Sequence, residues 1–290
     1  MVDKWKSMKQ WPELHLDCLE DSGVARILLN RPEKRNALTG TLIQAYFEAL
    51  EIVRADPELK VVITKGAGPV FSSGMDLHYL RSVSVGVAPL VDWDRVQLNI
   101  RLTEALREFP RILIAQVHGY CLGASFALMN VHDLVFAADN AQIGMPEIPR
   151  GSFGQIATST MFHAQIPIKK ASFIALTAEN VSGAEADRLG LVSKSFPEAE
   201  LEASTLKYAR DIASRHIAPL QHHKIAVQMG RDLSLSDAIK LDQLVGARQS
   251  RAIDPTAHVK DYLSSQKGGP KLSAEGYVRP DAAGGKDPKA

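Results

Sequence analysis

The sequence has few cysteines, almost no excess charge of either sign and no long apolar run. Its two cysteines, Cys18 and Cys121, are too few for a disulfide framework or a cysteine-rich metal cluster. Its 34 basic and 33 acidic side chains give a formal net charge of +1, which argues against a nucleic-acid or anionic-membrane binder. Residues 1–11 lack the apolar region of a secretory signal, and no run reaches the length of a membrane span. We therefore expect a cytoplasmic protein with no nucleic-acid partner, no membrane partner and no bound metal.

Strand-like and helix-like segments alternate through the first two thirds of the chain. Short, buried strands are predicted over residues 14–17, 24–29, 61–64, 112–117, 133–137 and 141–144. Helices are predicted over residues 41–55, with Thr39 as the N-cap, and over residues 93–109. Apolar residues make up 45% of the chain, which is enough for a sizeable core. The alternation therefore predicts an α/β core.

After Pro197 the strand pattern ends. Helical spacing is found over residues 200–216, 219–229, 234–247 and 256–266. From Gly268 the sequence is rich in Gly, Pro, Ala and Lys, which is typical of a flexible tail. We therefore divide the chain into a core of residues 12–197, a helical C-terminal region of residues 198–267 and a flexible tail of residues 268–290.

Two glycine-containing segments share one local pattern, in which a β-branched strand runs into a turn that opens a helix. They are residues 71–77 (FSSGMDL) and residues 117–125 (VHGYCLGAS). The first N–H groups of a helix lack helical partners, and the helix dipole adds partial positive charge to them. Two converging turns of this kind can hold one negative oxygen, as an enolate or a tetrahedral intermediate requires. Tight turns that serve packing alone are the alternative interpretation of Gly74 and Gly123.

Together with residues 29–38 (LNRPEKRNAL) and 144–148 (GMPEI), these segments resemble the crotonase (enoyl-CoA hydratase/isomerase) superfamily. The four motifs have the family's order and spacing, and the resemblance covers residues 14–266. It implies a crotonase-like spiral of repeated β-β-α units, with a helical C-terminal region that assembles a homotrimer or hexamer. It also implies an acyl-CoA substrate, so that coenzyme A is part of the thioester substrate and no cofactor is permanently bound.

The resemblance also implies roles for individual residues. The backbone N–H groups of Met75 and Ala124 match the family's oxyanion donors, although many members have glycine at the position of Ala124. The segments matching residues 31–38 and 73–77 contact coenzyme A in the family. The substrate and coenzyme A contacts expected here are Lys34, Arg35, Ala37, Ser73, Gly74, Asp76, Leu77, Gly123, Ala127 and Arg150.

The carboxylates decide which chemistry the chain supports. Two-glutamate hydratases have one glutamate on the helix after the second turn and another in the Pro-Glu motif. The second is present here as Glu147, but the first position is Ala127, and no acid lies within a helical turn of it. The chain therefore resembles a single-glutamate member, in which Glu147 moves protons while the oxyanion donors stabilise an enolate. Such machinery suits a lyase, hydratase or isomerase acting on a non-standard acyl-CoA.

Further details leave the exact reaction open. Phe126 and residues 240–243 match hydroxycinnamoyl-CoA hydratase-lyases, but the tyrosines of that branch are replaced within residues 236–238. Arg150 stands where that branch has an aromatic residue, and it suits binding of a substrate carboxylate or carbonyl, or pairing with Glu147. Two alternatives are a crotonase-fold hydrolase that cleaves a C–C or thioester bond of a ring-derived substrate, and a non-catalytic CoA-binding protein.

Overall fold

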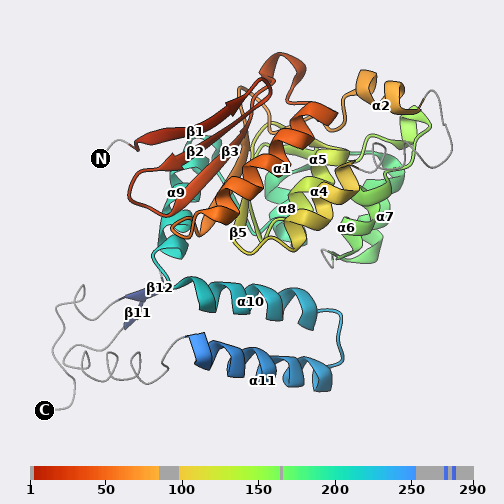
Figure 1. Cartoon of the computed structure of the whole chain (residues 1–290). Helices are drawn as coiled ribbons and strands as arrows, with labels where there is room; N and C mark the ends of the chain where they lie inside the picture. The colour runs from red at the N-terminus through yellow and green to blue at the C-terminus, as the bar shows by residue number, and fades with distance from the viewer. Residues whose placement is uncertain (1–2, 85–97, 164–165, 253–270, 274–275, 279–290) are drawn as a thin grey trace, which may run out of the picture. The chain divides into compact units, whose positions relative to one another are not determined.

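The computed structural model describes residues 3–84, 98–163, 166–252, 271–273 and 276–278. The chain forms two compact units, Met1–Gln221 and His222–Ala290. The predicted helix over residues 256–266 lies outside the described residues, as does most of the predicted tail. Figure 1 shows the first unit as helices packed around a sheet, which confirms the predicted α/β class.

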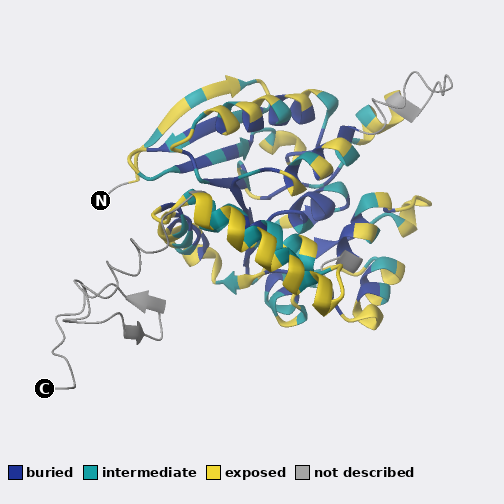
Figure 2. Ribbon diagram, turned by 60° about the horizontal axis from the view of Figure 1, so that its bottom comes forward, coloured by how far each residue is buried: buried dark blue, intermediate teal, exposed yellow. Residues whose placement is uncertain are grey.

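A seven-stranded sheet runs through the first unit in the order β1-β2-β3-β4-β5-β7-β10. β1, β2 and β3 are antiparallel neighbours, and every pair from β3 to β10 is parallel. All six residues of β5 are buried, as expected at the centre of a parallel sheet, whereas the outermost strand is exposed or intermediate in Figure 2. The strands are β1 (Trp5–Trp11), β2 (Leu14–Leu19), β3 (Val24–Leu29), β4 (Val61–Gly66), β5 (Ile112–Val117), β7 (Leu134–Ala138) and β10 (Lys194–Phe196).

A second, smaller sheet holds three very short strands. These are β6 (Tyr120–Leu122), β8 (Gln142–Gly144) and β9 (Val181–Ser182), in the order β6-β8-β9. The pattern of residues 141–144 thus predicted a strand correctly, but the sequence did not show that it belongs to a separate sheet. The sequence analysis also missed β1, β6, β9 and β10, because edge strands and strands of two or three residues carry little periodicity.

The chain visits the two sheets in turn and then forms a helix. β5 is followed by β6 and α5 (Ala124–Asn130), and β7 is followed by β8 and then α6 (Gln155–His163). β4 is followed by Ser72, which forms an isolated parallel bridge with Cys121, and then by α2 (Leu77–Ser84). This repetition of strand, short strand and helix is the β-β-α winding that the sequence predicted.

Helices cover both faces of the large sheet. α1 (Gly40–Ala55) lies in front of the strands in Figure 1, and α9 (Glu198–Ala213) lies behind them. α1 begins as predicted, because the Thr39 side chain accepts a hydrogen bond from the Leu42 N–H and caps the helix. α9, the first helix of the predicted C-terminal region, packs on the strands of the core. The other helices of this unit include α4 (Leu98–Arg107), α7 (Ile168–Thr177) and α8 (Gly183–Leu189).

The C-terminal part of the chain is mainly helical, as predicted. α10 (Ile217–Gly230) runs from the end of the first unit into the second, and α11 (Leu235–Ala252) follows it. β11 (Lys271–Ser273) and β12 (Gly276–Val278) pair antiparallel. No helix within the described ranges is both long enough and apolar enough to cross a membrane.

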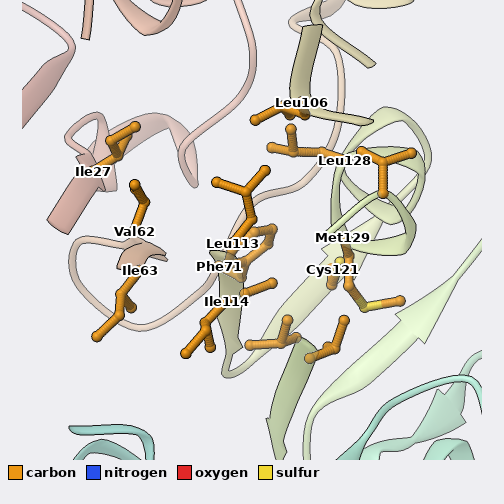
Figure 3. Close-up of a cluster of buried hydrophobic side chains, with 14 of the residues drawn as sticks. Ile27, Val62, Ile63, Phe71, Leu106, Leu113, Ile114, Cys121, Leu128 and Met129 are labelled. Carbon is orange, nitrogen blue, oxygen red and sulfur yellow. Dashed lines mark hydrogen bonds between the residues drawn. The ribbon is translucent and has the colours of Figure 1, made fainter. Parts of the chain in front are cut away.

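The hydrophobic core reaches the two glycine turns. Phe71 and Cys121, which precede those turns, lie in one buried cluster with residues of β4, β5 and α5 (Figure 3). Both side chains are fully buried, as is Met129 of α5. The start of each turn is therefore anchored to the same core, which restricts how far the turns can move relative to each other.

Asn36 ties the loop between β3 and α1 to the loop that follows β4. Its side-chain amide donates hydrogen bonds of 2.8 Å to the carbonyls of Ala67 and Val70, and its Oδ1 accepts one of 2.9 Å from the Arg31 N–H. The residue is fully buried, and its backbone is left-handed, with φ +52°. Asparagine suits this position because it tolerates that conformation while its amide satisfies buried backbone groups.

Replacing Asn36 with alanine should therefore destabilise the protein strongly. We expect Asn36→Ala to lower the free energy of unfolding by about 2–4 kcal/mol, because it leaves buried backbone groups unpaired. Arg35→Ala is the matched control, since Arg35 is exposed and also has a positive φ, +51°. Urea unfolding should place the control near the wild type, and equal losses for the two variants would contradict the role given to the amide.

Candidate active site

The two glycine turns lie side by side. The Ser72 N–H donates to the Tyr120 carbonyl at 2.9 Å, and the Leu122 N–H donates to the Ser72 carbonyl at 3.2 Å. These bonds continue the parallel pairing of β4 with β5 into the second layer of the fold. The segments that the sequence analysis singled out are thus adjacent because their parent strands are adjacent.

Gly74 lets the two turns touch. A β-carbon built on Gly74 would lie 2.5 Å from the Leu122 carbonyl oxygen and 3.3 Å from the Ala124 nitrogen, and its φ is +92°. A larger residue would therefore be strained in its backbone and would collide with the second turn. The predicted convergence of the turns is present, and it depends on a glycine at this position.

The N–H groups of Met75 and Ala124 are both free of protein acceptors within the described part of the chain. Met75 lies between two bonds to Leu38: the Leu38 N–H donates to the Gly74 carbonyl, and the Asp76 N–H donates to the Leu38 carbonyl. Ala124 is the first residue of α5, where the helix leaves its N–H groups unpaired. Two free backbone donors therefore stand on touching turns.

Glu147 lies against the second turn. A β-carbon on Gly123 would be 2.7 Å from Glu147 Oε1, and one on Gly154 would be 3.3 Å from Glu147 Cδ. The two glycines leave space for the carboxylate between them. Glu147 Oε2 is buried and has no hydrogen-bond partner among the described residues. The structure thus brings together the predicted acid/base and the turn of Ala124.

The surroundings of Glu147 favour its neutral form. Burial raises the pKa of this carboxyl, because the charged form loses its hydration. The Glu147 backbone N–H and the positive charge of Arg150 act in the opposite direction and limit the rise of the pKa. A carboxyl with a raised pKa is suited both to giving and to taking a proton near neutral pH.

Arg150 is a solvent-exposed neighbour of Glu147. It ends the short 3-10 helix η2 (Ile148–Arg150), and its N–H donates to the Glu147 carbonyl at 2.9 Å. In the described ranges the two side chains form no direct ion pair, and Arg150 pairs with no other carboxylate. The pairing of Glu147 with Arg150 that the sequence allowed is therefore not formed.

The loop between β3 and α1 borders the first turn. The Ser73 N–H donates to the Arg35 carbonyl at 2.9 Å, so the two expected coenzyme A segments are in contact. Lys34 and Arg35 are exposed, and Leu77 has 61% of its surface exposed. Ala37 is buried, with 7% exposure. The first three are open to a ligand, whereas Ala37 offers one little beyond its backbone.

Arg31, which was not among the expected site residues, holds this loop to the first turn. Its guanidinium is 2.9 Å from Glu13 Oε1 and 3.2 Å from Asp76 Oδ2, and it donates to the Ala37 carbonyl at 2.8 Å. Asp76 also accepts hydrogen bonds from the N–H groups at the start of α2, and these bonds with Arg31 hold the pKa of its carboxyl low. Asp76 therefore acts within the protein, and its carboxylate is already engaged.

Ala127 is buried on α5 with 3% exposure. The helix has the sequence ASFALMN, so it offers no acid in the place where a second glutamate was sought. Among the described residues, no group of three or more His, Cys, Asp and Glu side chains is placed to hold a metal ion. The acid/base function at this site falls to Glu147.

Comparisons with known proteins agree with this geometry. The sequence pattern of the family described as enoyl-CoA hydratase/isomerase matches residues 20–254. The hydroxycinnamoyl-CoA hydratase-lyase of Pseudomonas fluorescens is 31% identical over 232 residues, which cover 80% of this chain and 81% of the relative. The 2,3-dehydroadipyl-CoA hydratase of Escherichia coli (strain K12) is 31% identical over 253 residues, which cover 84% and 95%. A solved enoyl-CoA hydratase from Geobacillus kaustophilus HTA426 superposes with a TM-score of 0.81, at 25% identity and with coverage of 90% and 97%.

The packing of the Glu147 carboxylate against Gly123 generates a test. Gly123→Ala should abolish most activity, because its β-carbon would occupy the place of Glu147 Oε1. Gly190→Ala is the control: Gly190 also has a positive φ, +75°, but a β-carbon there meets nothing within 4 Å. Turnover of an acyl-CoA substrate should be measured for both variants at matched folded fraction. Equal activity of the two would mean that the carboxylate does not need its present place.

Proposed function

Because the chain belongs to the enoyl-CoA hydratase/isomerase family, we propose that it transforms an acyl-CoA thioester through an enolate, with Glu147 as the single acid/base. The observation that carries this proposal is the buried, unpartnered carboxylate of Glu147 beside the turn of Ala124. A buried carboxylate without a partner costs stability, so a packing role does not account for it. The same cost argues against a protein that only binds coenzyme A.

The two free N–H groups supply the electrostatic part of the mechanism. Removal of a proton next to a thioester carbonyl places negative charge on the carbonyl oxygen. Hydrogen bonds from Met75 and Ala124 to that oxygen strengthen as the charge develops, which lowers the barrier. Because both donors belong to the backbone, Ala124 is able to act where other members have glycine.

Glu147 supplies the proton transfer. As a carboxylate it accepts the proton released from the substrate carbon, and as a carboxylic acid it returns a proton to the same carbon or to another one. Return to a different carbon gives isomerisation, whereas transfer from an attacking water gives hydration, which a C–C cleavage can follow. The neighbouring apolar wall of Phe126 and Ala127 adds no second acid to assist a water. We therefore favour lyase, hydratase or isomerase chemistry on a non-standard acyl-CoA over hydration of short enoyl-CoAs.

The remaining assignments concern binding and assembly. We assign the coenzyme A part of the substrate to the first turn and the β3–α1 loop, where Lys34 and Arg35 are open to its phosphates. We assign the acyl group to the side of Glu147, Ala127 and Arg150. A homotrimer or hexamer in the cytoplasm is part of the same proposal, with coenzyme A entering only as part of the substrate.

Glu147→Gln tests the acid/base assignment. The amide is nearly isosteric but does not exchange protons, so turnover should fall by about two to four powers of ten while binding of the CoA thioester changes little. Glu58→Gln, at an exposed carboxylate, is the control and should retain wild-type turnover. A panel of acyl-CoA thioesters followed by mass spectrometry identifies the substrate and measures both variants. Near wild-type turnover of Glu147→Gln would remove the assignment.

Arg150→Gln tests the electrostatics of the site. A base must be ionised to act, so kcat/KM should rise with pH through the pKa of Glu147. Arg150 lowers that pKa, and removing its charge should therefore raise the pKa and move the acidic limb of the profile to higher pH. Arg107→Gln, at an exposed arginine of α4, should leave the limb in place. A limb that stays unchanged or moves to lower pH for Arg150→Gln would show that the arginine does not act on Glu147.

A further inference from the structure

The hydroxyl of Ser125 lies between the two glycine turns. Ser125 belongs to the first turn of α5 and is fully buried. Its Oγ accepts a hydrogen bond of 2.8 Å from the Leu122 N–H, and it lies 2.8 Å from the carbonyl oxygens of both Ser72 and Leu122. Its single proton is thus shared between two carbonyls, one on each segment. One side chain therefore contacts the approach to each turn.

These contacts join the two backbone segments that present the free donors. Leu122 precedes Ala124 by two residues, and Ser72 precedes Met75 by three. The direct backbone bond between the segments, from the Leu122 N–H to the Ser72 carbonyl, is longer, at 3.2 Å. The hydroxyl supplements that bond from both sides, since it accepts from the same N–H and donates to the same carbonyl.

The connection continues beyond Ser72. The Ser72 hydroxyl donates to the Asn36 carbonyl at 2.8 Å and accepts from the Gly74 N–H at 3.2 Å. Asn36 is itself held by the hydrogen bonds of its amide. Ser125 is therefore the last member of a buried series that fixes the first turn and then attaches the second turn to it.

We propose that Ser125 is a positioning residue whose hydroxyl sets the separation of the Met75 and Ala124 N–H groups. The inference rests on the proposed function, because the separation matters only if both groups bind one oxygen. Preorganised donors are effective because they need no rearrangement as charge develops, and small displacements reduce their effect steeply. Ser125 touches no substrate in this role and acts only through the two turns.

Removing the hydroxyl should weaken stabilisation of the enolate more than binding of the thioester. Ser125→Ala leaves the backbone bond between the turns in place, so the fold is retained but the donors lose their fixed separation. We expect kcat to fall by about tenfold while KM changes by less than about twofold. Ser125→Gly removes the same hydroxyl without adding bulk and should behave alike, which keeps the test valid if one variant folds poorly.

A thioester that forms an enolate by itself gives a readout that stability alone does not move. Acetoacetyl-CoA enolises reversibly, and its enolate absorbs in the ultraviolet. The wild type should raise the enolate fraction of the bound ligand above that in solution, and Ser125→Ala should reduce the bound enolate at a given pH by about tenfold. Thr205→Val is the control, because it removes a fully buried hydroxyl that bonds only the Leu201 carbonyl of α9.

The outcomes separate the inference from the function on which it rests. A raised enolate fraction in the wild type and in Thr205→Val, reduced in Ser125→Ala and Ser125→Gly, supports the positioning role. A fraction equally raised in all four proteins overturns that role and leaves the oxyanion site standing. A wild type that binds acetoacetyl-CoA without raising its enolate fraction overturns the oxyanion site, and the positioning role with it.

Discussion

The structure of this site depends on the close contact between Gly74 and the Leu122–Ala124 backbone. The contact is possible because β4 and β5 are parallel neighbours whose continuations also pair, at Ser72 and Cys121. Each turn is locally simple, and neither turn alone presents more than one free donor at this point. The function we propose therefore arises from the pairing of distant segments, and the large sheet serves to keep that pairing in register.

The electrostatics of the site follow from the same packing. Gly123 and Gly154 allow the Glu147 carboxylate to lie against the backbone, where water and hydrogen-bond partners are excluded from Oε2. A protein selected for stability alone would gain by replacing such a group. Arg150 offsets part of the cost from a distance, without forming a contact that would neutralise the carboxylate.

The sequence predicted the parts of the site that rest on local patterns. The strand-turn-helix signature of residues 71–77 and 117–125 was readable because glycine and β-branched residues have strong local preferences. Ser72 and Ser125 were not identified, since the role of a hydroxyl depends on which carbonyl the fold brings to it. Arg31 was assigned to the coenzyme A loop, but its ion pair with Asp76 joins residues that only tertiary structure brings together. The exposed strand β1 was missed for a similar reason, because an edge strand need not alternate in polarity.

Cys121 has a consequence for a protein that handles thioesters. It stands three residues before Ala124, at the approach to the second turn, yet its side chain points into the core shown in Figure 3. Burial raises the pKa of this thiol to about 12, so its thiolate is scarcely populated at neutral pH. Attack on an acyl-CoA requires the thiolate, and a buried, protonated sulfur does not exchange with the substrate. The acyl group is thereby protected from transfer to the protein by transthioesterification, and alkylating reagents that inactivate exposed thiols should leave Cys121 unmodified while the fold persists.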